Sequence, residues 1–196
     1  FAMNCCMEHR GGVGYETNTG DGAGIMTGMP HDFLNALAKD LFGRELPGPG
    51  EYGVGNIFLP TDSAQRAQCK GIIEQAIEDA GQALIGWREL PTNADLADVG
   101  KAARAAMPAF EQLFVGKGAI GGMENESFER KLYTIRKHSA HLVRADESIE
   151  QSHLFYMCSL STNVIIYKGM LTPDQLFPFF GDLTNSAFES HMAMVH

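Results

Sequence analysis

Long apolar runs are missing from this 196-residue sequence, although 44% of its residues are hydrophobic. No stretch approaches the roughly 18 to 20 consecutive apolar residues that a membrane-spanning helix needs. No basic segment followed by an apolar stretch opens the sequence, so the pattern of a signal peptide is missing too. This length and apolar content are ordinary for one globular domain, and we therefore predict a single domain with a sizeable core.

Positive charge is also in short supply. The sequence has 15 lysine and arginine residues against 24 aspartate and glutamate residues, which gives a formal net charge of −9. No basic block or stripe interrupts this acidic balance. Because nucleic acids and anionic membrane surfaces attract basic patches, we expect neither of them as a partner.

Cysteine is scarce and lacks a functional spacing. The four residues are Cys5, Cys6, Cys69 and Cys158, which match no zinc signature and no thioredoxin-like pair. Adjacent Cys5 and Cys6 would not easily bridge each other. The absence of a disulfide pattern predicts a reducing compartment, the cytoplasm, and we expect these cysteines to pack as small buried hydrophobes.

Hydrophobic periodicity predicts strands mixed with helices. The predicted strands cover residues 25–29, 52–59, 83–89, 110–115, 154–160, 164–167 and 188–196, and the predicted helices cover 30–42, 61–80, 124–145 and 172–180. Residues 92–107 give a weaker, partly helical pattern. Thr61 or Asp62 is expected to cap the second helix. The predicted inward faces of the three long helices hold Phe33, Leu34, Leu37 and Leu41; Ile72, Ile73, Ala76 and Ile77; and Phe128, Leu132, Ile135 and Leu142.

Thr162 and Asn163 alone separate the predicted strands 154–160 and 164–167. A two-residue connection is typical of a hairpin, so we predict that these strands are antiparallel neighbours. The pattern shows no internal repeat and no domain boundary. Strands with one hairpin and helices packed against them indicate an α+β layered domain.

The two ends read as interrupted elements. Residues 1–7 read like the last turns of a helix that has no N-cap residue before it. Residues 188–196 read as a buried strand that stops, where natural termini usually taper into polar residues. We therefore expect a fragment that is incomplete at both ends, with an unusual natural chain as the alternative.

Three segments of the sequence carry motifs. Residues 7–12 (Met-Glu-His-Arg-Gly-Gly) lead to residues 19–25 (Thr-Gly-Asp-Gly-Ala-Gly-Ile), residues 84–93 read Leu-Ile-Gly-Trp-Arg-Glu-Leu-Pro-Thr-Asn, and residues 155–161 (Phe-Tyr-Met-Cys-Ser-Leu-Ser) lead to residues 166–170 (Ile-Tyr-Lys-Gly-Met). In this order and at about this spacing, the segments resemble the large subunits of glutamate synthases. The matches span nearly the whole chain.

The resemblance implies an N-terminal nucleophile hydrolase fold, a layered α-β-β-α sandwich with two stacked antiparallel sheets. It implies that residues 1–196 are part of one type 2 glutamine amidotransferase domain, which hydrolyses glutamine to glutamate and ammonia. The remaining domains of the synthase would bind FMN and an iron–sulfur cluster and pass the ammonia to 2-oxoglutarate. No cofactor and no metal are expected in this chain, and the electron donor (NADPH, NADH or ferredoxin) stays open.

The family's chemistry uses an N-terminal cysteine. A free α-amino group, with a pKa of about 7.7 to 8.0, can act as the base for the thiol of its own residue. The thiolate attacks the glutamine amide, hydrogen-bond donors stabilise the oxyanion, and the acyl-enzyme is then hydrolysed. This sequence departs from the pattern because its first residue is Phe1. We expect the nucleophile upstream of Phe1, no catalytic residue within the chain, and no glutaminase activity from the chain alone.

Four residues are pocket candidates by the same resemblance. Arg10 and Gly11 form the Arg-Gly pair that lies beside the N-terminal cysteine in the family, and a loop arginine paired with nearby carboxylates is the alternative. Asp21 would support that loop, and an ordinary turn aspartate is the favoured alternative. His196 matches the histidine of the family segment His-x-Arg-Phe-Ser-Thr-Asn, whose arginine binds the glutamine carboxylate.

The remaining patterns indicate less. The glycine-rich segment is not followed by Gly-Lys-Ser/Thr, so we predict no nucleotide binding. His138 and His141 are three residues apart, but no cysteine or carboxylate completes a metal set, and a solvated helix face explains them. Besides the glutaminase, a second hypothesis stays open, namely a non-catalytic binding or structural module on the same fold.

Overall fold

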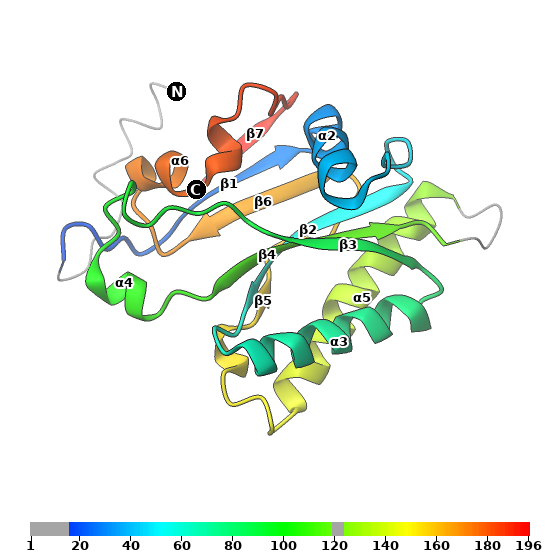
Figure 1. Ribbon diagram of the computed structural model, residues 1–196, viewed down its shortest axis with the longest axis horizontal. Coiled ribbons are helices and arrows are strands. Elements are labelled where there is room, and N and C mark those ends of the chain that lie inside the picture. Colours follow the sequence, from blue (N-terminus) through cyan, green and yellow to red (C-terminus); the bar gives the residue numbers. More distant parts are fainter. Residues whose placement is uncertain (1–15, 119–123) are drawn as a thin grey trace.

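The computed structural model describes residues 16–118 and 124–196 (Figure 1). The strands are β1 (Ala23–Gly28), β2 (Tyr52–Leu59), β3 (Ala83–Glu89), β4 (Ala109–Gly116), β5 (Tyr156–Met157), β6 (Val164–Gly169) and β7 (Ala193–Val195). The α-helices are α2 (His31–Phe42), α3 (Ser63–Asp79), α4 (Lys101–Ala105), α5 (Asn125–Ala145) and α6 (Leu176–Phe179). Short 3-10 turns cover η2 (Ser152–Leu154), η3 (Pro173–Gln175) and η4 (Gly181–Thr184). The fold is therefore a mixed one, as predicted.

Two antiparallel sheets organise the chain (Figure 1). One has the strand order β6-β1-β7 and the other the order β3-β4-β2-β5. Strand β4 shows how the layers arise, because its side chains alternate between two faces. Phe110 and Phe114 join the core that both sheets and α2 share, whereas Leu113 and Val115 join a second core with α3 and α5. The two long helices thus cover one face of the four-stranded sheet.

Local signals set several element boundaries as predicted. Asp62 caps α3, and its carboxylate accepts hydrogen bonds from the backbone nitrogens of Ala64 and Gln65 at 3.1 and 2.9 Å. Gly43 ends α2 in the left-handed conformation with φ 65°. The strands 52–59 and 83–89 have the predicted bounds, and α4 supplies the helical part of residues 92–107.

Two predicted inward residues on the helices are exposed. Leu41 on α2 has a relative exposure of 54% and Leu142 on α5 one of 38%, while their neighbours Ala38 and Val143 are buried. On α5 the buried stripe continues at i+3 and i+4 spacing from Ile135 to Val143, so Leu142 falls beside it. In each case a neighbouring apolar residue takes the inward position.

The predicted hairpin between strands 154–160 and 164–167 is wrong. Strand β5 pairs with β2 in the four-stranded sheet, whereas β6 pairs with β1 in the other sheet. Ser161 still exchanges two backbone hydrogen bonds with Val54, at 3.0 and 3.2 Å. Thr162 then donates from its backbone nitrogen and from its hydroxyl to Glu129 on α5, both at 2.8 Å. These partners make the Thr162–Asn163 segment a crossover from one sheet to the other.

The predicted buried strand over residues 188–196 is also wrong in length and burial. Only Ala193–Val195 are extended as β7, and all three are exposed at the edge of the sheet. The preceding residues turn locally, since the hydroxyl of Ser190 donates to the backbone oxygen of Met192 at 2.7 Å. Among the residues that the structure describes, no helix has the length and apolar character needed to cross a membrane.

Candidate functional site at one end of the three-stranded sheet

The start of β1 and the end of β7 lie side by side, and this sheet end holds two of the predicted pocket residues. His196 exchanges two backbone hydrogen bonds with Gly24, at 2.9 and 3.1 Å. Asp21 is exposed and lies two residues before β1. The C-terminus lies at this end in Figure 1. Two candidates that are far apart in sequence thus belong to the same end of the sheet, while Arg10 and Gly11 lie outside the described residues.

The described cysteines are not suited to nucleophilic chemistry. Cys69 on α3 is buried, and burial together with the charge of Asp146 raises the pKa of its thiol to about 11. Cys158, which follows β5, is buried as well, and burial raises its pKa to about 12. Because the thiolate is the nucleophile, both residues stay unreactive near neutral pH. The prediction of packed cysteines is confirmed for these two, whereas Cys5 and Cys6 lie outside the described residues.

No metal centre forms among the residues that the structure describes. Within residues 16–118 and 124–196, no three histidine, cysteine, aspartate or glutamate side chains are grouped to hold an ion. His138 and His141 are exposed on α5, which agrees with the solvated helix face predicted for them.

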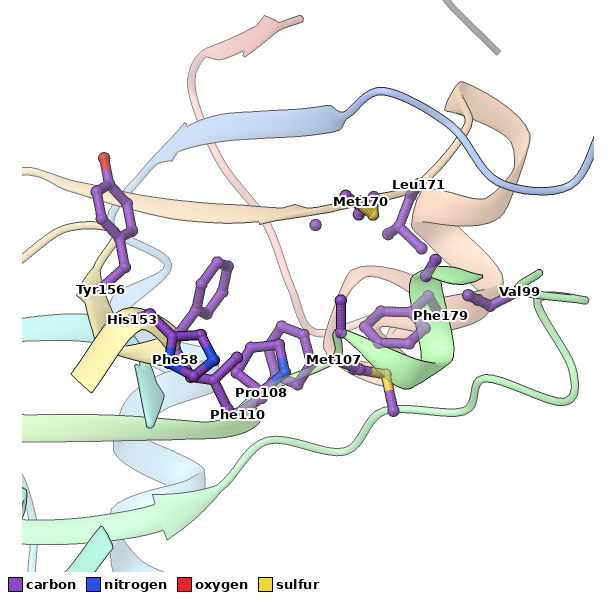
Figure 2. Close-up of a pocket in the computed structure, with 14 residues that line it drawn as sticks. Phe58, Val99, Met107, Pro108, Phe110, His153, Tyr156, Met170, Leu171 and Phe179 are labelled. Carbon is purple, nitrogen blue, oxygen red and sulfur yellow. The ribbon is translucent and has the colours of Figure 1, made fainter. Parts of the chain in front are cut away.

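A cavity of about 210 Å³ opens beside the same end of the sheets (Figure 2). Its walls come from the loops after β6 and before β4 and from α6, and the residues labelled in Figure 2 are Phe58, Val99, Met107, Pro108, Phe110, His153, Tyr156, Met170, Leu171 and Phe179. Only His153 and Tyr156 bring polar side-chain groups into this lining. A free amino acid carries a carboxylate and an ammonium group that need polar partners, so this cavity does not suit glutamine.

A buried polar network joins the two sheets, and the sequence did not predict it. Arg88 donates from Nε to Gln112 at 2.8 Å and from its two terminal nitrogens to the carboxylate of Asp182. Tyr167 donates to the same carboxylate at 2.8 Å, and Gln112 donates to Asn56 at 2.7 Å. All five side chains are at most 8% exposed. The sequence signal that could have indicated this network is the presence of polar residues at inward positions of otherwise apolar strands.

Burial, reinforced by the Asp182 carboxylate, also raises the pKa of Tyr167 well above its ordinary value. The phenol therefore stays protonated and remains a hydrogen-bond donor at every physiological pH.

The comparisons with known proteins identify the family. The family model described as "Glutamine amidotransferases class-II" matches residues 1–196, the whole chain. The chain belongs to the class-II glutamine amidotransferases. The family assignment made from the three motif segments is thereby confirmed.

Relatives of this amidotransferase chain carry consistent names. It is 38% identical over 194 residues to the glutamate synthase [NADPH] large chain of Bacillus subtilis, with 99% of this chain covered. It is 38% identical to the glutamate synthase [NADH] of Schizosaccharomyces pombe (98% covered) and 40% identical to a ferredoxin-dependent glutamate synthase of Arabidopsis thaliana (97% covered). The chain spans only 9 to 12% of the length of these three relatives.

Proposed function

We propose that this chain is the glutaminase part of a glutamate synthase and that residues 1–196 belong to one glutamine amidotransferase domain. In this role it hydrolyses glutamine to glutamate and ammonia, and the ammonia passes to 2-oxoglutarate in the remaining domains. The observation that carries the proposal is the match of the whole chain to class-II glutamine amidotransferases, together with three relatives that are named glutamate synthases.

The proposed fold is the α-β-β-α sandwich of N-terminal nucleophile hydrolases. In this proposal the two sheets and the helices α3 and α5 would form three of the four layers, and the packing of both helices against the four-stranded sheet supports it. On the opposite face of β6-β1-β7, the register sets Met26 beside Ile166 and Met194, and Met194 is 61% exposed. An apolar sheet face needs a covering layer, which supports a second set of helices on this side.

The proposed nucleophile is an N-terminal cysteine upstream of Phe1, as the family resemblance implies. The raised pKa values of Cys69 and Cys158 support this, because they leave neither described cysteine as a thiolate. Arg10 and Gly11 would lie beside that cysteine, and Arg10 would hold the terminus through its planar guanidinium group. Asp21 and His196 would belong to the surrounding pocket, and their common position at one sheet end supports this grouping.

FMN and an iron–sulfur cluster belong to the remaining domains in this proposal. Cysteine thiolates hold such clusters, and the two cysteines that the structure describes lie buried on separate elements with no further ligand grouped around them. The electron donor of the full-length protein could be NADPH, NADH or ferredoxin, since all three occur in the names of the relatives. We also keep the cytoplasm as the proposed compartment, because both described cysteines are free.

The test replaces Arg10 by lysine in the full-length protein and compares glutamine with ammonium as the nitrogen source. Lysine keeps the charge but loses the two-pronged hydrogen bonding, so we expect glutamine-dependent turnover to fall by about a hundredfold. Ammonium-dependent turnover should persist, because this route bypasses the glutaminase site. Arg44→Lys is a matched control, since Arg44 is exposed and donates to the backbone oxygen of Ile85. Wild-type protein without any glutamine turnover would favour the binding or structural module instead.

A further inference from the structure

The loop formed by residues 16–20 is held from two sides just before it enters β1. On one side lies Gln175, whose side chain is buried with only 6% exposure. Its Nε2 donates to the backbone oxygen of Asn18 at 2.8 Å and to that of Asp98 at 3.0 Å. Its Oε1 accepts from the backbone nitrogen of Thr172 at 2.9 Å. One carboxamide thus uses both its donor hydrogens and its acceptor to tie together three segments.

On the other side, the turn before α4 closes against the same loop. The carboxylate of Glu16 accepts from the hydroxyl of Thr19 at 2.8 Å and from the backbone nitrogen of Ala102 at 3.0 Å. Gly100 donates from its backbone nitrogen to Asn18 at 2.9 Å. A Cβ at Gly100 would collide with the side-chain oxygens of Glu16 and Thr19, so both side chains would have to shift to admit a larger residue.

This held loop leads the backbone directly into the proposed glutamine site. A Cβ at Gly20 would collide with the backbone oxygen of Leu171, so the loop also packs tightly at its end. Asp21 follows directly, and Gly24 pairs with His196 three residues later. The loop therefore lies directly before the sheet end that carries both described pocket candidates.

We propose that Gln175 is a positioning residue for glutamine hydrolysis. It acts through the loop of residues 16–20 and does not itself touch the substrate. The inference rests on the proposed function and adds a residue that lies outside every motif segment. Only a carboxamide can donate to the two backbone oxygens and accept from Thr172 at once, since a carboxylate would face those oxygens with negative charge and methionine offers no hydrogen to donate.

The test uses Gln175→Met in the full-length protein. We expect kcat/KM for glutamine to fall by roughly tenfold, because loop shifts well below 1 Å already misplace reacting groups. The KM for 2-oxoglutarate should not change, since that site lies elsewhere in the proposal. The matched control is Gln68→Met. Gln68 also donates twice, to Asp146 and Ser148, but on the helical face of the other sheet, so its replacement should leave both values unchanged.

A second variant tests the inference without altering Gln175. Gly100→Ala pushes on Glu16 and Thr19 from the opposite side and should lower kcat/KM for glutamine as well. Its control is Gly71→Ala, because a Cβ at Gly71 meets no atom within 4 Å. If Gln175→Met does not fold, Gly100→Ala tests the role of the loop through the kcat/KM for glutamine and the KM for 2-oxoglutarate.

Two results would overturn the inference. One is an unchanged kcat/KM for glutamine in a variant that folds. The other is a KM for 2-oxoglutarate that worsens by the same factor as the kcat/KM for glutamine, which indicates a general defect. Wild-type protein that lacks glutamine turnover would reject the proposed function together with this inference. If the wild-type protein is active and Gln175→Met has the same kcat/KM for glutamine, only the positioning role is rejected.

Discussion

The buried pair of Arg88 and Asp182 gives the sharpest prediction about stability. Asp182→Leu would leave the guanidinium of Arg88, which is 8% exposed, without its carboxylate, and the hydroxyl of Tyr167 without its acceptor. Removing one partner of a buried ion pair costs about 3 to 5 kcal/mol, because the remaining charge stays desolvated. We expect a loss of this size in the free energy of unfolding.

Replacing both charges should cost less than replacing one. In Arg88→Met combined with Asp182→Leu no charge is left unpaired, and the remaining cost comes from Tyr167 and Gln112, which each lose a hydrogen-bond partner. An unsatisfied buried polar group costs about 1 to 3 kcal/mol. The double variant should therefore be no less stable than Asp182→Leu alone, although it carries one more substitution.

The assay is urea unfolding of the chain, followed by the fluorescence of Trp87. The sequence has one tryptophan, and Trp87 reports on β3 because it packs against the second core and donates to Glu74 at 2.8 Å. The reasoning is refuted if Asp182→Leu costs less than about 1 kcal/mol, the value typical of an exposed ion pair. Simple addition of the two single effects in the double variant would refute it as well.

Three further predictions concern single sites. Gly71→Ala in α3 should stabilise the chain by about 0.5 to 1 kcal/mol, because alanine favours a helix interior and the site is open. Gly43→Ala should destabilise the chain by about 1 kcal/mol, because Gly43 has a left-handed φ of 65°. The two variants should shift the urea midpoint in opposite directions. Hydrogen bonds from Ala102 and Thr19 hold the pKa of Glu16 below its ordinary 4.5, so its stabilising effect is present above that pH and is lost as pH falls through the lowered pKa. The stability difference between wild type and Glu16→Gln should therefore shrink in acid, and a constant difference would contradict it. Cys69 and Cys158 should resist alkylation by iodoacetamide at pH 7 until the chain unfolds, as mass spectrometry of the two peptides would reveal.

The parts of the fold that depend on nearby residues were predictable. Asp62 caps α3 through atoms two and three residues away, and a strand such as Tyr52–Leu59 has its own apolar content and a terminating proline. The hairpin prediction was wrong because the segment around Thr162 and Asn163 bonds to Val54 and Glu129, which are distant in sequence. The periodicity of a sequence carries no information about partners that are so distant.

The candidate site divides in the same way. The motif containing Asp21 and the matched residue His196 come to the same sheet end, and their role in a pocket stays a prediction. By contrast, Gln175 and Asp182 each make a decisive hydrogen bond with residues that are 77 to 157 positions away in the sequence. Their local sequence gives no sign of those contacts, because a polar residue in a short turn is ordinarily solvated.

The transfer of the glutamine amide nitrogen tests the central claim most directly. Full-length protein would receive glutamine labelled with a heavy nitrogen isotope in its side-chain amide, together with 2-oxoglutarate and a reductant. If the chain is the glutaminase part of a glutamate synthase, the label appears in the α-amino group of newly formed glutamate, and its rate of incorporation falls by about a hundredfold in Arg10→Lys. Absence of label from glutamate made by the wild-type protein, with all components present, would contradict the account.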